Sequence, residues 1–147
     1  MVGTTDLGVL FVAGFGPIAR TPARGCAFWR DTLGLPLTPM EGNPDYLVAH
    51  GLEGAKHFAV WPLAQAAQSC FGTEAWPEDV PVPQCWVEFD VADLERATAL
   101  LKERGCALLV ENRKEPWGQR VSRLLAPEGT LIGVTHTPAL REGGGEA

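Results

Sequence analysis

The order of predicted elements repeats within this sequence, and that repeat is the strongest constraint on its fold. Each half has the pattern of a strand, a helix and three further strands. Gly34 and Gly105, which each end a predicted helix, lie 71 positions apart. Leu37 and Leu108, which each begin the next strand, share that offset. Side-chain identity between the halves is low, so we expect two structurally similar modules within one domain over residues 1–138.

The first module is predicted over about residues 7–62. An apolar run at 7–15, free of proline, is typical of a buried strand. Thr21 as the N-cap and Pro22 at the first helical position begin a helix that ends at Gly34. Its expected core face, at spacings i, i+3 and i+7, holds Cys26, Trp29 and Leu33, with Phe28 beside them. Three short strands follow, at residues 37–41, 46–50 and 57–61.

The second module is predicted over about residues 84–137. Asp93 caps a helix that ends at Gly105. The expected strands are at residues 85–90, 108–112, 120–125 and 131–135. The last two form a hairpin, whose turn contains Pro127 and Gly129. Because proline fixes φ and glycine tolerates positive φ, we expect Gly129 at φ > 0.

The segments outside the two modules have a different composition. Residues 62–83 contain four prolines and show no alternation of apolar and polar residues, and we expect them to connect the modules with at most one or two helical turns. A connection this long in a small domain is usually functional or forms an interface. Residues 139–147 are expected to be a disordered tail.

Composition excludes several classes of partner. Eighteen acidic against 12 basic residues give a net charge of −6, which argues against a nucleic-acid or anionic-membrane partner. No apolar run approaches the roughly 20 residues of a membrane span, and the N-terminal residues lack the basic region of a signal peptide. The four cysteines form no CxxC motif, which favours reduced thiols and a cytoplasmic location.

Two motifs give the sequence a resemblance to a known family. The segment AFWRDTLGL at 27–35 and the turn Pro127-Glu128-Gly129 before the strand 131–135 resemble the vicinal oxygen chelate superfamily, which includes glyoxalase I, extradiol dioxygenases and bleomycin resistance proteins. The resemblance covers residues 7–138. It implies an α+β fold of two βαβββ modules that form a curved mixed sheet around a pocket. It also implies a homodimer, because the pockets of bleomycin resistance proteins lie between subunits.

The same resemblance implies where a divalent metal would bind, and this sequence departs from that pattern. Metalloenzymes of the superfamily take His or Gln from the first strand of a module and Glu from the last. Here residues 13–17 offer no ligand and residues 57–61 offer no carboxylate. Trp86 stands where a histidine is expected, and Gly133 stands at the usual glutamate position. We therefore expect no metal ligands and no cofactor.

His57 and Glu88 are the candidate catalytic residues. His57 shares strand parity with Trp61, and Glu88 shares it with Trp86, so all four can face one pocket. A His57–Glu88 pair would form an acid/base couple, because histidine titrates near neutral pH. The alternative is that His57 is an ordinary strand residue with a hydrogen bond to water or backbone.

Aromatic side chains at strand ends are the other candidates for a site. Large apolar pockets with few polar groups suit planar or apolar ligands. Alternatively, these tryptophans fill the core or lie at a dimer interface. Arg120 and Arg123 point to opposite faces of one strand, so one of them can meet a ligand anion; otherwise both are solvated. The expected ligand-binding residues are Phe15, His57, Trp61, Trp86, Glu88, Trp117 and Arg123.

These observations favour a small-molecule-binding protein of the glyoxalase/bleomycin-resistance type, without a catalytic metal and with its ligand in an aromatic-lined pocket. The alternative is a metal-dependent enzyme, a glyoxalase-type lyase, an isomerase or a dioxygenase, that acts on a small oxygenated substrate. A structural or protein-interaction module is the third class. The expected partners are a small-molecule ligand and a second copy of the chain.

Overall fold

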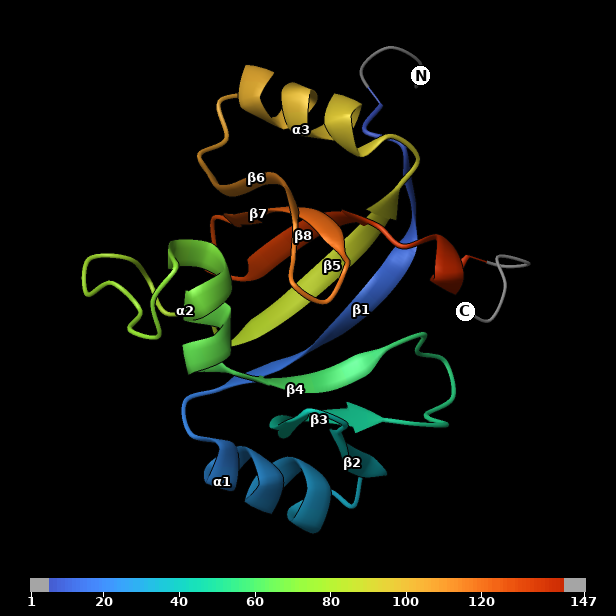
Figure 1. The fold of residues 1–147 in the computed structure, drawn as a ribbon, viewed down its shortest axis with the longest axis vertical. Helices are drawn as coiled ribbons and strands as arrows, with labels where there is room; N and C mark the ends of the chain where they lie inside the picture. The colour runs from blue at the N-terminus through green and yellow to red at the C-terminus, as the bar shows by residue number, and fades with distance from the viewer. Residues whose placement is uncertain (1–5, 142–147) are drawn as a thin grey trace. The chain divides into compact units, whose positions relative to one another are not determined.

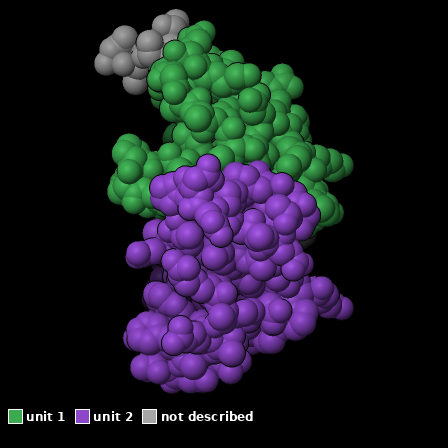
Figure 2. All heavy atoms as spheres, turned by 90° about the vertical axis from the view of Figure 1, so that its left-hand side faces the viewer, with its two compact units in different colours: residues 1–13, 87–147 green, residues 14–86 purple. Residues whose placement is uncertain are grey.

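The computed structural model describes residues 6–141 and has a mixed α and β fold (Figure 1). Within that range it contains eight strands, three α-helices, a π-helix and a short 3₁₀ helix. The chain divides into two compact units (Figure 2): unit 2 covers residues 14–86, and unit 1 covers the residues before and after it. No helix in the described range is long and apolar enough to cross a membrane.

The strands of unit 2 follow the order β2-β3-β4-β1. The elements are β1 (Val9–Ala19, whose first residues belong to unit 1), α1 (Pro22–Gly25), the π-helix η2 (Cys26–Thr32), β2 (Leu37–Met40), β3 (Asn43–Ala49), β4 (Phe58–Pro62) and α2 (Leu63–Phe71). β1 runs parallel to β4, with Phe15 opposite Phe58, whereas β3 is antiparallel to both β2 and β4. The core contains Ala19, Leu37, Leu47, Phe58 and Val60.

The first helix differs from the prediction. A single α-helix was expected to end at Gly34, but α1 is short and continues as η2, in which the Leu33 N–H donates to the Phe28 carbonyl at 2.9 Å, an i→i+5 bond. Because this winding places more residues in each turn, the i, i+3, i+7 face is lost. Cys26 and Trp29 still pack on the core, but Phe28 and Leu33 are about half exposed, so their predicted core position is wrong.

Unit 1 repeats the same order of elements. They are β5 (Cys85–Val91, whose first two residues belong to unit 2), α3 (Leu94–Glu103), β6 (Leu108–Lys114), β7 (Arg120–Leu125) and β8 (Leu131–His136). The strand order is β5-β8-β7-β6, and α3 packs against β6, β7 and β8 (Figure 1). The Asp93 side chain caps α3 by accepting from the Arg96 N–H at 3.1 Å. The βαβββ order of both modules and the α+β class with a mixed sheet are confirmed.

The hairpin turn has the predicted conformation. Gly129 has φ of 95°, and its N–H donates to the Ala126 carbonyl at 2.8 Å. The Ala126 N–H in turn donates to the Thr130 carbonyl at 2.9 Å. The turn thereby sets the register of β7 and β8, in which Arg123 lies opposite Gly133.

Two segments outside the predicted modules are more regular than expected. Within the connection, α2 extends over Leu63–Phe71 and so exceeds the one or two turns predicted. At the C-terminus, Pro138–Leu140 form a 3₁₀ helix, and Arg141 pairs with the buried Asp90 at 2.8 Å. The described residues thus include the first three positions of the expected tail, and residues 142–147 lie outside them.

Candidate functional site

The residues predicted to line a pocket come from both units. Phe15, His57, Trp61 and Trp86 belong to unit 2. Glu88, Trp117 and Arg123 belong to unit 1.

In unit 2, four aromatic rings follow one another in a row. The Tyr46 and His57 rings are stacked with centroids 6.2 Å apart, and the next steps, from His57 to Trp86 and from Trp86 to Trp61, are 6.1 and 5.9 Å. The Tyr46 hydroxyl lies 2.9 Å from His57 Nε2, so the row has a polar pair at one end. We call these four residues the aromatic row.

A glycine of β1 lets the aromatic row pack closely. A Cβ on Gly14 would lie 3.1 Å from Cη2 of Trp86 and 3.2 Å from Cδ2 of His57. Both contacts are tighter than most packed side chains make, so Gly14 leaves the space in which these rings sit. Because glycine has no side chain, the two rings can lie close to the backbone at Gly14.

Burial divides the aromatic row into two parts. Trp86 and Trp61 are 3% and 6% exposed, and the Trp86 Nε1–H donates to the Ala59 carbonyl at 3.2 Å. His57 and Tyr46 are half-buried. Phe15 is 38% exposed and packs edge-on against Phe58, with centroids 5.2 Å apart. The two tryptophans therefore form the inner part of the row, and His57 and Tyr46 form its more accessible end.

In unit 1, a buried guanidinium lies between two carboxylates. Arg123 on β7 is 1% exposed, and its Nη1 lies 2.8 Å from Glu88 Oε2 on β5. Its Nη2 lies 3.6 Å from Glu115 Oε2, a carboxylate that is also buried. The sequence left open whether Arg120 and Arg123 are both solvated. Arg120 is exposed to solvent, whereas Arg123 is buried.

A glutamine completes this cluster. Gln119 Nε2 donates to Glu88 Oε1 at 2.8 Å and to Thr135 Oγ1 at 3.0 Å. Trp117, which is 59% exposed, donates from Nε1 to Gln119 Oε1 at 2.8 Å. Both carboxylate oxygens of Glu88 therefore accept hydrogen bonds from the protein's own side chains.

Gly133 leaves the room that the ion pair occupies. A Cβ at this position would lie 2.9 Å from Glu88 Cγ and 3.5 Å from Arg123 Nη1. Such a distance to Glu88 is shorter than packed carbon atoms tolerate. The position that lacks the glutamate expected for a metal site is thus the position against which Glu88 and Arg123 pack.

The acid/base couple predicted from His57 and Glu88 stays a prediction. His57 has Tyr46 and Trp86 as partners in unit 2, and Glu88 has Arg123 and Gln119 in unit 1. Among residues 6–141, no group of three or more His, Cys, Asp or Glu side chains is placed to hold a metal ion.

Sequence reasoning missed Tyr46, Gln119 and Glu115. Tyr46 is the only tyrosine in the sequence and falls in a predicted strand, which was the one available signal. Glu115 and Gln119 lie in the lead-in to β7, where no strand periodicity indicates which side chains turn inward. Gln119 donates to Glu88, which lies 31 positions away in the sequence, and Glu115 pairs with Arg123 across the bend before β7, so local pattern could not identify either residue.

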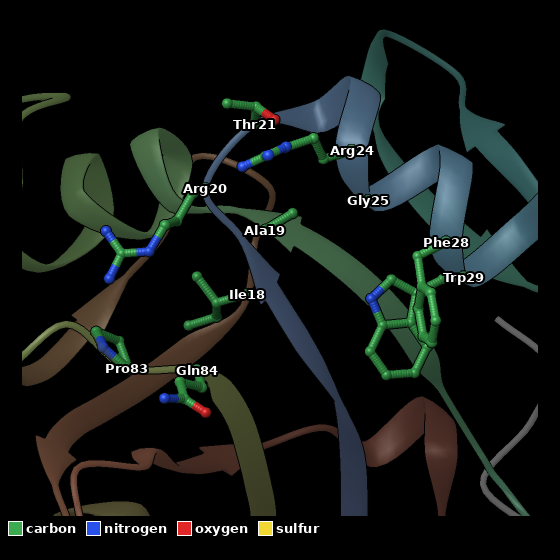
Figure 3. A pocket seen from close by; sticks show the side chains of 10 residues that line it. All are labelled: Ile18, Ala19, Arg20, Thr21, Arg24, Gly25, Phe28, Trp29, Pro83 and Gln84. Carbon is green, nitrogen blue, oxygen red and sulfur yellow. The ribbon is translucent and has the colours of Figure 1, made fainter.

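Unit 2 also carries an open hollow of about 310 Å³ (Figure 3). It lies beside β1 and the start of the first helix, and none of the predicted ligand-binding residues lines it. Its lining residues are Ile18, Ala19, Arg20, Thr21, Arg24, Gly25, Phe28, Trp29, Pro83 and Gln84.

Comparison with solved structures shows the same fold in other proteins. Methylmalonyl-CoA epimerase from Mycobacterium tuberculosis has a TM-score of 0.58 and 19% identity, with 92% of each chain covered. A glyoxalase/bleomycin resistance protein/dioxygenase superfamily member from Vibrio splendidus 12B01 has a TM-score of 0.53 and 15% identity, over 84% of this chain and 96% of that one. The Mn(II)-bound glyoxalase from Novosphingobium aromaticivorans has a TM-score of 0.53 and 13% identity, over 92% of this chain and 40% of that one.

The sequence itself identifies the family. A search of curated proteins found no match. The family model for the Glyoxalase/Bleomycin resistance protein/Dioxygenase superfamily matches residues 17–134, which is most of the chain. The resemblance inferred from the two sequence motifs is therefore confirmed. The chain belongs to the Glyoxalase/Bleomycin resistance protein/Dioxygenase superfamily.

Proposed function

We propose that this protein binds a small planar or apolar molecule in an aromatic-lined pocket and does so without a catalytic divalent metal. The observation that carries the absence of a metal is the engagement of Glu88, the one acidic residue among the expected ligand-binding residues. Its Oε2 lies 2.8 Å from Arg123 Nη1, and its Oε1 accepts from Gln119 at 2.8 Å.

Charge supports the absence of a metal at this position. A divalent cation bound to Glu88 would lie beside the buried guanidinium of Arg123, where low solvent exposure leaves their repulsion poorly screened. A metal that displaced Arg123 from Glu88 would weaken a buried ion pair, and breaking such a pair costs about 3–5 kcal/mol. In this proposal Glu88 therefore neutralises the charge of Arg123 and does not bind a metal.

The aromatic row supports a binding role. The half-buried Tyr46–His57 pair at one end offers two stacked rings, a hydroxyl and an imidazole to a ligand. Because Trp61 and Trp86 are buried, they would form the back wall of the site. The half-buried Tyr46 and His57 would meet the polar group of the ligand.

We also propose that the protein is a cytoplasmic homodimer. β1 exposes large apolar side chains in unit 1, where Val9, Leu10 and Val12 are 49%, 52% and 44% exposed. Neighbouring exposed apolar residues on one strand favour a protein contact. A second copy of the chain would cover Leu10 and Val12, which share strand parity and so lie on one face.

A fluorescence titration tests the binding proposal. Small aromatic compounds are added to protein treated with EDTA, and quenching of tryptophan emission is followed. We expect saturable quenching, and we expect Tyr46→Phe to raise the Kd roughly fivefold, because it removes one hydrogen bond worth about 1 kcal/mol. Trp76→Phe is the matched control: Trp76 lies after α2, outside the aromatic row and outside the expected ligand-binding residues, and the Kd should stay the same.

Two outcomes would contradict the proposal. The first is the absence of saturable quenching by any aromatic compound in the panel. The second is turnover of an oxygenated substrate that appears only when a divalent metal is added back. That second result would favour the alternative of a metal-dependent lyase, isomerase or dioxygenase.

A further inference from the structure

We propose that the open hollow of unit 2 is a second binding site, specific for a small organic anion with one flat apolar ring, such as an aryl carboxylate or an aryl phosphate. It is distinct in its residues from the aromatic row and does not depend on the proposed function. The hollow has a volume of about 310 Å³, which suits a ligand with a single ring.

The lining of the hollow is basic. Arg20 and Arg24 are exposed, and neither has an ion pair or hydrogen bond within residues 6–141. No acidic side chain lines the hollow. In a chain with a net charge of −6, two guanidinium groups without a neighbouring carboxylate mark a local reversal of charge. The planar guanidinium group matches carboxylate and phosphate oxygens in geometry, so the hollow favours those anions.

The other end of the hollow is aromatic. Phe28 is 48% exposed, and its ring meets that of Trp29 edge-on, with centroids 5.2 Å apart. The Trp29 ring also packs against the ring of Phe58, and their centroids lie 6.3 Å apart. In Figure 3 the two rings lie together at one end of the hollow, and the guanidinium groups lie toward the other. A ligand with a ring at one end and an anion at the other matches this separation.

The frame of the hollow is fixed by close packing. A Cβ on Gly25 would lie 3.0 Å from Ala19 Cβ and 3.1 Å from Val60 Cγ1, so the helix sits directly on β1 and β4. The Ile18 N–H donates to the Gln84 carbonyl at 2.9 Å, which ties the lining residues around Pro83 to β1. Because the backbone is already ordered, a ligand has to order few groups beyond the two arginine side chains.

A two-dimensional ¹H–¹⁵N NMR titration tests the proposal on the intact protein. The probes are benzoate and phenyl phosphate, with benzyl alcohol as the uncharged comparison and inorganic phosphate as the anion without a ring. The sequence has five tryptophans, so the Trp29 indole signal can be assigned by its loss in Trp29→Phe. We expect saturable shifts of this signal with benzoate or phenyl phosphate, and weaker or no shifts with the two comparison compounds.

Substitutions separate the contributions of charge and ring. Arg20→Gln and Arg24→Gln should each raise the Kd of the bound aryl anion about three- to tenfold, since both groups are partly screened by solvent. Phe28→Ser should weaken binding of both aryl anions. Arg30→Gln is the matched control, because Arg30 pairs with Asp31 at 2.9 Å and does not line the hollow, and its Kd should equal that of the parent.

Several results would overturn the proposal. Equal affinity for benzyl alcohol and benzoate would show that the arginines do not contribute to binding. An unchanged Kd in the two arginine variants would show the same. Shifts of the Trp86 indole signal with no shift at Trp29 would place the aryl anion at the aromatic row and not in the hollow. All these positions are exposed, so far-ultraviolet circular dichroism should confirm that Arg20→Gln, Arg24→Gln and Phe28→Ser remain folded.

Discussion

Substituting Gly133 by alanine tests whether the ion pair of unit 1 depends on the missing side chain at this position. The added Cβ would lie 2.9 Å from Glu88 Cγ and 3.3 Å from Val121 Cγ2. Glu88 cannot swing aside freely, because Arg123 and Gln119 hold its two oxygens, each at 2.8 Å. Val121 is fully buried on the neighbouring strand and cannot retreat into solvent.

The expected cost follows from this crowding. Adding a carbon to a packed core costs about 1–3 kcal/mol, and we expect roughly 2 kcal/mol here. A chain of 147 residues loses about 2–4 °C of Tm for each kcal/mol, so the Tm of Gly133→Ala should fall by about 4–8 °C.

The measurement is thermal unfolding followed by circular dichroism, in a double-mutant cycle with Glu88→Ala. Removing Glu88 Cγ relieves the closest contact, so Gly133→Ala should cost less than about 1 kcal/mol in that background. A Tm for Gly133→Ala within about 1 °C of the parent would refute the reasoning. An equal cost in both backgrounds would show that Glu88 is not what the new methyl group meets.

Three further predictions concern the turn, the aromatic row and the assembly. Gly129→Val should lower the free energy of unfolding in urea by about 1–2 kcal/mol, which is the backbone strain at a φ of 95°, since no atom lies near enough to clash with the new side chain. The same variant should weaken ligand binding by disturbing the register of β8, and a variant as stable as the parent would contradict this interpretation of the turn. Trp86→Ala should cost about 3–5 kcal/mol, because the ring is 3% exposed, and it should also abolish quenching by aromatic ligands; a large loss of stability with unchanged binding would make Trp86 a core residue alone. Light scattering at micromolar concentration should give twice the 15.8 kDa chain mass, and the mass of a single chain would argue decisively against a dimer.

Local signals in the sequence predicted much of the fold. The Asp93 cap, the positive φ of Gly129 and the ends of β7 at residues 120 and 125 are as expected, because each depends on residues close together in the chain. The π-helix was not predictable in this way. No residue type or spacing in the segment 22–33 distinguishes the i→i+5 bond of a π-helix from the i→i+4 bond of an α-helix.

The candidate site was only partly accessible to sequence reasoning. Strand parity selected His57 and Trp86, which the structure brings together in the aromatic row. Tyr46 joins them through the pairing of β3 with β4, a register that no sequence offset reveals. Arginine is expected at the surface, and Arg123 is buried because two carboxylates from separate segments meet it there.

Elemental analysis of the purified protein tests the central claim most directly. Metal content per chain is measured by inductively coupled plasma mass spectrometry, before and after dialysis against EDTA. Because Gly133 replaces the expected glutamate and Glu88 is engaged by Arg123, we expect far less than one transition metal ion per chain in both samples. About one ion per chain, removed only by the chelator, would contradict the claim that this protein binds its ligand without a metal.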